Sequence, residues 1–108
     1  FRPHEFECPL TGALVLHLPS ADRLDRVRER VGQPLVVTSG YRSPEYNRRV
    51  GGATGSFHMK GRAFDIRTTD SVLRMKLIQA AIAEGFSGLG HYRTFTHLDT
   101  GHSRSWWG

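Results

Sequence analysis

Cysteine and long apolar runs are both scarce in this sequence of 108 residues. Cys8 is the only cysteine, so no disulfide can form within the chain, and we expect Cys8 to be a small buried hydrophobe rather than a metal ligand. No apolar stretch reaches the roughly 18 residues typical of a membrane-spanning helix. The sequence therefore predicts a protein without internal disulfides and without membrane insertion.

No signal peptide is visible in the sequence, and the chain opens at Phe1 rather than at a methionine. These absences predict a processed or excised part of a longer protein. The length suits one domain with a modest core, and we expect residues 1–108 to form that single domain.

Acidic residues are fewer than basic ones, 10 against 15, and the net charge is +5. A basic chain can bind nucleic acid, an anionic membrane or an anionic polymer. The basic side chains are scattered over expected helices, however, and form no stripe interleaved with aromatic residues, so no nucleic-acid partner is expected. A solvated helix surface is the favoured explanation, and attraction to an anionic cell wall is compatible with it.

What the sequence does have is a histidine and an aspartate seven residues apart, His58 and Asp65, with Gly61 between them. On a continuous helix these side chains would lie roughly 10 Å apart along the axis, too far to share an ion. Residues 62–67 instead alternate as on a half-buried strand, and Gly61 allows a tight turn that folds His58 back over Asp65. The spacing thus predicts two ligands of a metal site.

A third ligand is available near the C-terminus, where residues 95–99 alternate again and place His97 and Asp99 on one face. If the two short strands lie side by side, His97 meets His58 and Asp65. A His-Asp-His set fits a catalytic zinc ion, which typically takes three protein ligands and a water. The alternative is three ordinary surface residues, since short His/Asp motifs often arise by chance.

Longer blocks of sequence favour the metal site. Ser-x-His-x-x-Gly-x-Ala-x-Asp at residues 56–65, followed by His-x-Asp at residues 97–99, resembles the zinc D-alanyl-D-alanine carboxypeptidase family, which is related to lysostaphin-type peptidases and the hedgehog domain. Further blocks match the family's order. They are Ser39-Gly40-Tyr41-Arg42-Ser43, Asn47 and Val50-Gly51-Gly52-Ala53 upstream, and Gly88-Leu89-Gly90, Thr100-Gly101, Arg104 and Trp106 downstream.

The resemblance implies a zinc metallopeptidase that hydrolyses peptide bonds of bacterial peptidoglycan, in a cross-link or a stem peptide, through a metal-activated water. His58, Asp65 and His97 would hold one zinc ion, and the partners would be peptidoglycan peptides. Such a module would act in the cell envelope or periplasm, or be secreted or associated with a phage particle. The implied fold is α+β, with a small, mainly antiparallel sheet flanked by helices.

Local patterns predict where the elements of this fold lie. Ser20 is expected to cap a helix that ends at Gly32, and Ser43-Pro44 begins a second helix. Asp70 begins a third, with an apolar face that is expected to be core. The apolar residues of that helix are Val72, Leu73, Met75, Leu77, Ile78, Ala81 and Ile82. Strands are expected at residues 35–38, 62–67, 88–92 and 95–99.

The resemblance also suggests roles around the metal. Arg42, at a strand-to-helix corner, would hold the substrate's carboxylate or carbonyl, because arginine can clamp such groups with two hydrogen bonds. A structural ion pair with Glu45 is the alternative. Ser56 is expected to hydrogen-bond near the site. Of the two adjacent tryptophans, Trp106 is assigned to the substrate groove.

The general base is the least determined role. Many relatives carry an acid or a histidine two to three residues before the last zinc ligand, but Thr94 and Phe95 stand there in this sequence. The remaining candidates are Asp99, on the same strand face as that ligand, and His91, with His102 as a third choice. Asp99 could instead orient the imidazole of a ligand.

Other functions stay open beside a wall-degrading peptidase. One is a D,D-carboxypeptidase or dipeptidase that acts on small soluble peptides, which a closed pocket would favour. Another is a catalytically inactive, zinc-containing module that binds the cell wall, which the missing base favours. A basic wall-anchoring domain without enzymatic activity would bind in a salt-sensitive way and be indifferent to chelators.

Overall fold

The computed structural model describes residues 3–108 as one five-stranded sheet with helices packed on it. The strand order is β1-β2-β4-β3-β5, and every neighbouring pair is antiparallel except β3 and β5, which run parallel. This arrangement confirms the predicted α+β class with a small, mainly antiparallel sheet. The strands are β1 Val37–Ser39, β2 Ala63–Arg67, β3 Gly88–His91, β4 Phe95–Asp99 and β5 Arg104–Trp107.

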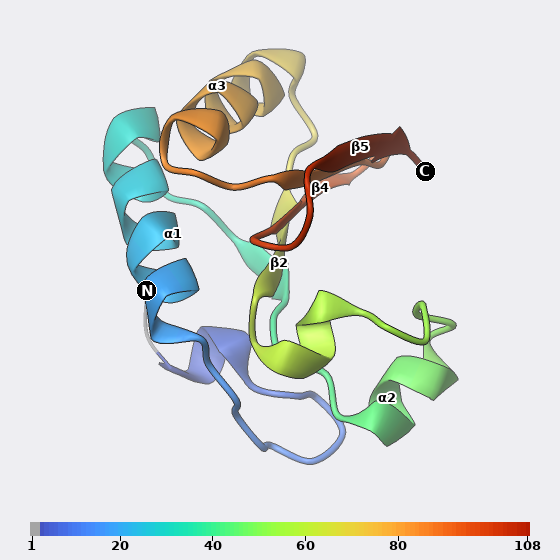
Figure 1. The fold of residues 1–108 in the computed structure, drawn as a ribbon. Coiled ribbons are helices and arrows are strands. Elements are labelled where there is room, and N and C mark those ends of the chain that lie inside the picture. The colour runs from blue at the N-terminus through green and yellow to red at the C-terminus, as the bar shows by residue number, and fades with distance from the viewer. Residues whose placement is uncertain (1–2) are drawn as a thin grey trace.

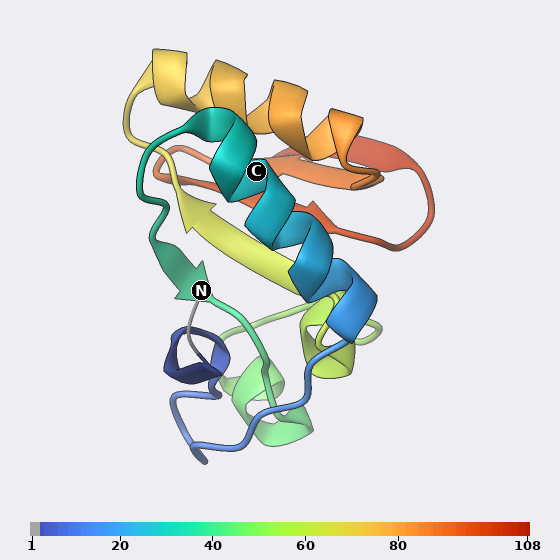
Figure 2. The same ribbon diagram turned by 90° about the vertical axis from the view of Figure 1, so that its left-hand side faces the viewer.

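Two helices cover one face of the sheet, as Figures 1 and 2 show. α1 (Leu18–Val31) and α3 (Ser71–Ala83) lie there side by side, whereas the short α2 (Pro44–Arg49) lies away from both, below the sheet in Figure 1. Two short 3-10 helices, η1 (Pro3–Phe6) and η2 (Phe57–Lys60), complete the described elements. None of the helices within residues 3–108 is long and apolar enough to cross a membrane.

The hydrophobic core lies between α1, α3 and the sheet. Phe64, Ile66 and Leu98 from β2 and β4 are buried there together with Leu24 and Leu77 from the helices. Side chains alternate along a strand, so the neighbours of these residues point to the opposite face. The expectation of a half-buried strand was wrong for β2, because four of its five residues are buried and both of its faces are covered.

Helix α1 begins earlier than predicted, with His17 as its N-cap and Pro19 in its first turn. Ser20, the predicted cap, lies fully buried inside that turn. Its Oγ is 2.6 Å from Nδ1 of His17 and 2.8 Å from Oγ1 of Thr100, so the hydroxyl binds side chains rather than the helix N–H groups. Proline is favoured in a first turn, which explains the earlier start. The predicted end at Gly32, with φ 74°, is confirmed.

The other two helices begin where predicted. Oγ of Ser43 accepts a hydrogen bond from the backbone N of Tyr46 at 3.2 Å, which caps α2. Oδ1 of Asp70 accepts one from the backbone N of Val72 at 2.9 Å, which caps α3. Both are the side-chain caps expected of these residue types.

The apolar face expected of α3 is only partly buried. Leu77 and Ala81 lie in the core, but Val72, Met75 and Ile82 are 52, 53 and 59% exposed. These three share one stripe of the helix, at spacings of three and seven residues. The prediction of one wide core-facing stripe was wrong, because α3 buries only the side that meets the sheet and α1.

Two strands differ from expectation. β1 lies two residues later than the predicted start of its strand. β5 was not predicted as a strand, and it pairs in parallel with β3, so that Gly90 lies opposite Trp106 and His91 opposite Trp107. The pairing directs Trp106 and Trp107 to opposite faces of the sheet, and Trp107 is 84% exposed.

Candidate metal centre

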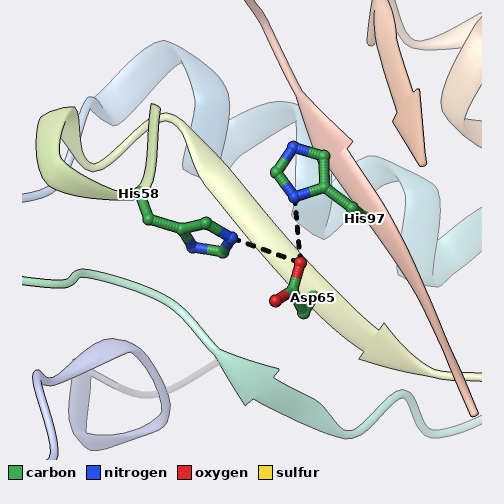
Figure 3. Close-up of side chains that lie close together, drawn as sticks. All are labelled: His58, Asp65 and His97. Atoms are coloured by element: carbon green, nitrogen blue, oxygen red, sulfur yellow. Dashed lines mark hydrogen bonds and ion pairs between the residues drawn. The ribbon is translucent and has the colours of Figure 1, made fainter. Parts of the chain in front are cut away.

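Three side chains converge on the face of the sheet that α1 and α3 leave open. Oδ1 of Asp65 lies 3.2 Å from Nε2 of His58 and 3.0 Å from Nδ1 of His97. Dashed lines mark both contacts in Figure 3. All three residues are buried, and one possible ligand atom from each lies within 4.8 Å of the others. The structure thus brings together the three residues that the sequence spacing predicted as metal ligands.

Strand pairing positions two of the three side chains. Asp65 of β2 lies directly opposite His97 of β4 in an antiparallel pair. Residues opposite each other in such a pair place their side chains on the same face, with Cβ atoms about 5 Å apart. The register therefore brings the carboxylate to the imidazole, and a slip of one residue in either strand would send one of them to the core face.

The turn at η2 positions the third side chain. Oγ of Ser56 accepts a hydrogen bond from the backbone N of His58 at 3.2 Å, and Gly61, with φ 65°, ends the turn. A Cβ at Gly61 would meet the backbone of Val15 and Leu16, so glycine is needed for both conformation and space. The predicted turn that folds His58 back over Asp65 is confirmed.

The outer nitrogens of the two histidines determine their tautomers. Nδ1 of His58 lies 2.7 Å from the carbonyl O of Gly40, which can only accept, so this nitrogen carries a proton. Nε2 of His97 likewise donates to Oδ2 of Asp99 at 2.7 Å. When the rings are neutral, Nε2 of His58 and Nδ1 of His97 therefore direct lone pairs at Asp65.

Asp99 is held as an ionised acceptor. Arg104 donates to both of its carboxylate oxygens, at 3.0 and 2.7 Å, and the backbone N of Gly101 donates to Oδ1 at 2.9 Å. Burial alone would raise the pKa of Asp99, but hydrogen bonds from His97, Arg104 and Gly101 outweigh burial and hold the pKa well below its usual range. Asp99 can therefore only accept a hydrogen bond from His97 at neutral pH.

The three ligand atoms together form a site for a cation. Two lone pairs and a carboxylate oxygen repel one another unless positive charge lies between them. Burial alone would raise the pKa of Asp65, but its contacts with His58 and then His97 outweigh burial and lower this pKa. Burial alone would lower the pKa of His97, but its contacts with Asp65 and then Asp99 outweigh burial and raise this pKa. The centre thus favours positive charge beside the carboxylate, and its nitrogen–oxygen–nitrogen donor set suits a divalent ion such as zinc.

The family model described as Peptidase M15 matches residues 5–99, a range that includes all three candidate ligands. The chain belongs to the peptidase M15 family. This membership confirms the family that the sequence blocks indicated.

Two curated relatives are similar to this M15 chain. The zinc D-Ala-D-Ala carboxypeptidase of Streptomyces albus G is 34% identical over 90 residues, which cover 78% of this chain and 35% of that protein. The probable peptidoglycan L,D-endopeptidase MepK of Haemophilus influenzae is 39% identical over 82 residues, which cover 68% of this chain and 43% of that protein. The chain therefore spans less than half the length of either relative.

A cavity of about 480 Å³ lies over the candidate metal centre of this M15 chain, and the three ligands form part of its wall. The rest of the wall combines guanidinium groups and aromatic rings with a glycine-rich segment. The side chains that line it beside the ligands include Arg42, Ser56, Phe57, Tyr92, Phe95, Asp99, His102, Arg104 and Trp106. Charged donors and apolar surfaces close to a metal site suit a peptide ligand.

Arg42 lies at the expected strand-to-helix corner and contacts the centre directly. Its Nη2 lies 3.3 Å from Oδ2 of Asp65, the carboxylate oxygen that is not directed at the histidines, and its Nε donates to Oγ of Ser39 at 3.2 Å. The guanidinium group thus orients the carboxylate, which sequence reasoning missed because no spacing rule links the two positions. The alternative pair with Glu45 does not form, since Glu45 binds Arg49 at 3.0 Å.

The two other residues predicted to meet substrate also line the cavity. Ser56 caps the turn that carries His58. The ring of Trp106 lies 5.1 Å from that of His97, and its Nε1 donates to the hydroxyl of Tyr92 at 2.8 Å. Tyr92 was not recognised from the sequence as a residue of this cavity. The signal that could have indicated it is its place directly after β3, the strand that pairs with β4, which carries His97.

The candidate bases lie in different places. Asp99 is fully buried and bound through both oxygens. His91 directly follows Gly90, which pairs with His97, so its side chain points to the opposite face and does not line the cavity. The structure therefore does not bring His91 together with the three candidate ligands. His102 lines the cavity and is exposed.

Proposed function

We propose that this chain is a zinc-dependent peptidase that hydrolyses peptide bonds of bacterial peptidoglycan. The observation that carries the proposal is the buried set of His58, Asp65 and His97, in which two imidazole lone pairs converge on one carboxylate oxygen. Membership of the peptidase M15 family supports peptide hydrolysis. The names of the two relatives support zinc and a peptidoglycan substrate.

Each candidate ligand has an outer contact that supports zinc binding. The carbonyl O of Gly40 accepts from His58, the carboxylate of Asp99 accepts from His97, and Arg42 donates to Asp65. Such outer contacts orient metal ligands and strengthen metal binding. When bound, zinc would polarise the scissile carbonyl group and make the attacking water more acidic.

Arg42 is the residue best placed to hold the peptide substrate. A guanidinium group carries five N–H donors, and the structure records three of its hydrogen bonds, to Ser39, Asn47 and Asp65. The remaining donors can bind a carbonyl or terminal carboxylate of a peptide in the cavity. Ser56 and Trp106 would border that peptide, Ser56 near the turn that carries His58 and Trp106 beside His97.

A peptidoglycan substrate also implies a place of action. The bond would lie in a cross-link or a stem peptide, and the protein would act in the cell envelope or periplasm, as a secreted protein, or on a phage particle. The net charge of +5 would favour approach to an anionic wall polymer. Small soluble peptides are the alternative substrates, which would make the protein a D,D-carboxypeptidase or dipeptidase.

A catalytically inactive, zinc-containing wall-binding module is the second candidate. The observation that favours it is the absence of an acid at Thr94 and Phe95, where many related peptidases place their base. Such a module would keep zinc and would bind peptidoglycan without releasing any fragment.

Hydrolysis of purified peptidoglycan by the zinc-loaded chain tests these functions against one another. The proposal expects new peptide products, sensitive to a chelator, and their masses identify the bond that is cut. His58→Ala should release none, whereas His4→Ala, a change at an exposed histidine in η1, should match the wild type. Zinc binding without products would favour the binding module, and cleavage of small peptides alone would favour the dipeptidase.

A further inference from the structure

Peptide hydrolysis needs a group that accepts the proton of the attacking water, and the cavity offers few. Beside the candidate ligands, the titratable side chains that line it are Arg42, Tyr92, Asp99, His102 and Arg104. Guanidinium groups stay protonated, and a tyrosine hydroxyl is a better donor than acceptor of protons at neutral pH. Both oxygens of the buried Asp99 already accept hydrogen bonds. His102 is the one that remains.

The segment that carries His102 is fixed against both elements that bear a metal-binding histidine. The backbone N of Gly101 donates to Asp99 of β4 at 2.9 Å, and Arg104 of β5, which also binds Asp99, donates to the carbonyl O of His102 at 3.0 Å. Toward η2, the ring of Phe57 packs so closely on Gly101 that a Cβ would not fit there. The backbone at His102 is therefore anchored beside the metal centre.

The imidazole itself is left available. Its ring lies 6.4 Å from that of Phe57, and it makes no hydrogen bond or ion pair with any of residues 3–108. Three cationic groups lie over the same Phe57 ring: Nζ of Lys60 and the guanidinium of Arg104 are each 5.3 Å from its centre, and the guanidinium of Arg62 is 6.0 Å from it. No carboxylate of the described residues holds the ring, so the imidazole can contact a ligand in the cavity.

We propose that His102 is the general base of the peptidase activity proposed above, on which this inference rests. Its imidazole takes a proton from the attacking water while the water oxygen bonds to the scissile carbonyl carbon. The carbon–nitrogen bond then breaks, and the imidazolium gives the proton to the leaving amine nitrogen, so His102 ends the cycle neutral. An imidazole suits both steps because its unprotonated nitrogen can accept a proton and then donate it again.

His102→Gln tests this role with little effect on the fold, because the side chain is exposed. General base catalysis contributes about 10²–10⁴-fold, and we expect a loss of that order in kcat/KM on solubilised peptidoglycan. Zinc content and melting temperature should stay at the wild-type values. His4→Gln is the matched control, since it makes the same change at an exposed histidine outside the cavity, and it should keep full activity.

Two further readouts separate a base from a residue that only supports the loop. Added imidazole should restore part of the activity of His102→Ala, because a small base can fill the space left by the ring. The acidic limb of the pH profile of kcat/KM should change in His102→Gln and stay unchanged in His4→Gln.

The outcomes that contradict the assignment are distinct. If the wild type hydrolyses peptidoglycan and His102→Gln keeps kcat/KM within about threefold, His102 is not the base and the proposed function stands. Loss of activity together with loss of zinc would make His102 a structural residue. Loss in Tyr92→Phe but not in His102→Gln would move the role to Tyr92. No hydrolysis by the zinc-loaded wild type would overturn both proposals.

Discussion

Asp99 accepts a hydrogen bond from Nε2 of His97 at 2.7 Å, while Arg104 donates to both oxygens of the same carboxylate. The guanidinium keeps Asp99 ionised, and the ionised carboxylate keeps the proton of His97 on the nitrogen that faces away from Asp65. The tautomer of a candidate zinc ligand is thus determined by a side chain that does not touch the metal position.

Asp99→Asn should therefore weaken zinc binding. An amide can still accept from His97, but it loses the negative charge and the paired contact with Arg104. Loss of such an outer contact typically costs about 10–100-fold in metal affinity, and competition with a chromogenic chelator measures it. Glu45→Gln, which removes a carboxylate from an exposed ion pair, is the control and should leave the affinity unchanged. Equal affinities in all three proteins would show that Asp99 does not support the metal centre.

Gly61→Ala should destabilise the fold and disturb the metal centre together. The left-handed conformation at φ 65° costs a residue with a Cβ about 1–2 kcal/mol, and here the added atom also meets the backbone of Val15 and Leu16. Gly32→Ala is the matched control, because Gly32 has φ 74° but open space around the added atom. Urea unfolding should show the larger loss for Gly61→Ala, and only that variant should bind zinc more weakly. Equal losses of unfolding free energy in Gly61→Ala and Gly32→Ala would mean that the backbone of residues 15 and 16 moves away from the added Cβ at no cost in stability.

The local part of the metal centre was predictable from sequence. Gly61 permits a turn, and alternation at residues 62–67 and 95–99 gives the faces of Asp65 and His97. The register that sets Asp65 opposite His97 was not derivable, because alternation alone allows any even shift between two strands. The blocks that resemble the family supplied the missing link, and the structure brings the side chains together.

Other features were missed because they depend on contacts between distant segments. Arg42 reaches Asp65 across 23 residues of sequence, and no local pattern signals that pairing. The position of His91 depends on such a contact too, because the face on which its side chain lies follows from the pairing of β3 with β4. Ser20 looked like a helix cap by residue type, but its hydroxyl is used by Thr100, 80 residues away.

Trp106 and Trp107 are adjacent residues of the same type, so substituting each in turn tests whether the substrate binds in the cavity over the metal centre. Trp106 lines the cavity beside His97, whereas Trp107 lies on the other face and is 84% exposed. Trp106→Ala should raise KM for peptidoglycan peptides, with a loss of about tenfold or more in kcat/KM, because a large apolar contact is removed. Trp107→Ala should change kcat/KM little. The reverse order of effects would place the substrate on the other side of the sheet.

The ion pairs of Glu84 join α3 to α1, and their contribution to stability should depend on pH. Glu84 binds Arg30 and Arg26 of α1 from the end of α3, and hydrogen bonds from Arg30 and then Arg26 lower its pKa below the ordinary glutamate value. Because the pKa of Glu84 is lower in the folded protein than in the unfolded chain, its ion pairs stabilise the fold fully at pH values above the unfolded-state pKa. This stabilisation is lost as the pH falls through the folded-state pKa and Glu84 becomes protonated.

The melting temperature of Glu84→Gln should accordingly lie slightly below that of the wild type at neutral pH. The difference should shrink as the solution is made acidic, from about pH 5 downward. Glu45→Gln, at an exposed pair within α2, should show a smaller difference at every pH. A difference between wild type and Glu84→Gln that grows in acid would contradict the assigned direction of the pKa shift.

Titration of the metal-free chain with zinc, followed by calorimetry, tests whether His58, Asp65 and His97 form a metal centre. We expect about one zinc ion per chain for the wild type and for Asp22→Ala, a change at an exposed carboxylate of α1. Binding should be lost in Asp65→Ala, because the carboxylate contacts both imidazoles. A wild-type chain that binds no zinc, or an Asp65→Ala variant that binds it as tightly as the wild type, would contradict a metal centre at His58, Asp65 and His97.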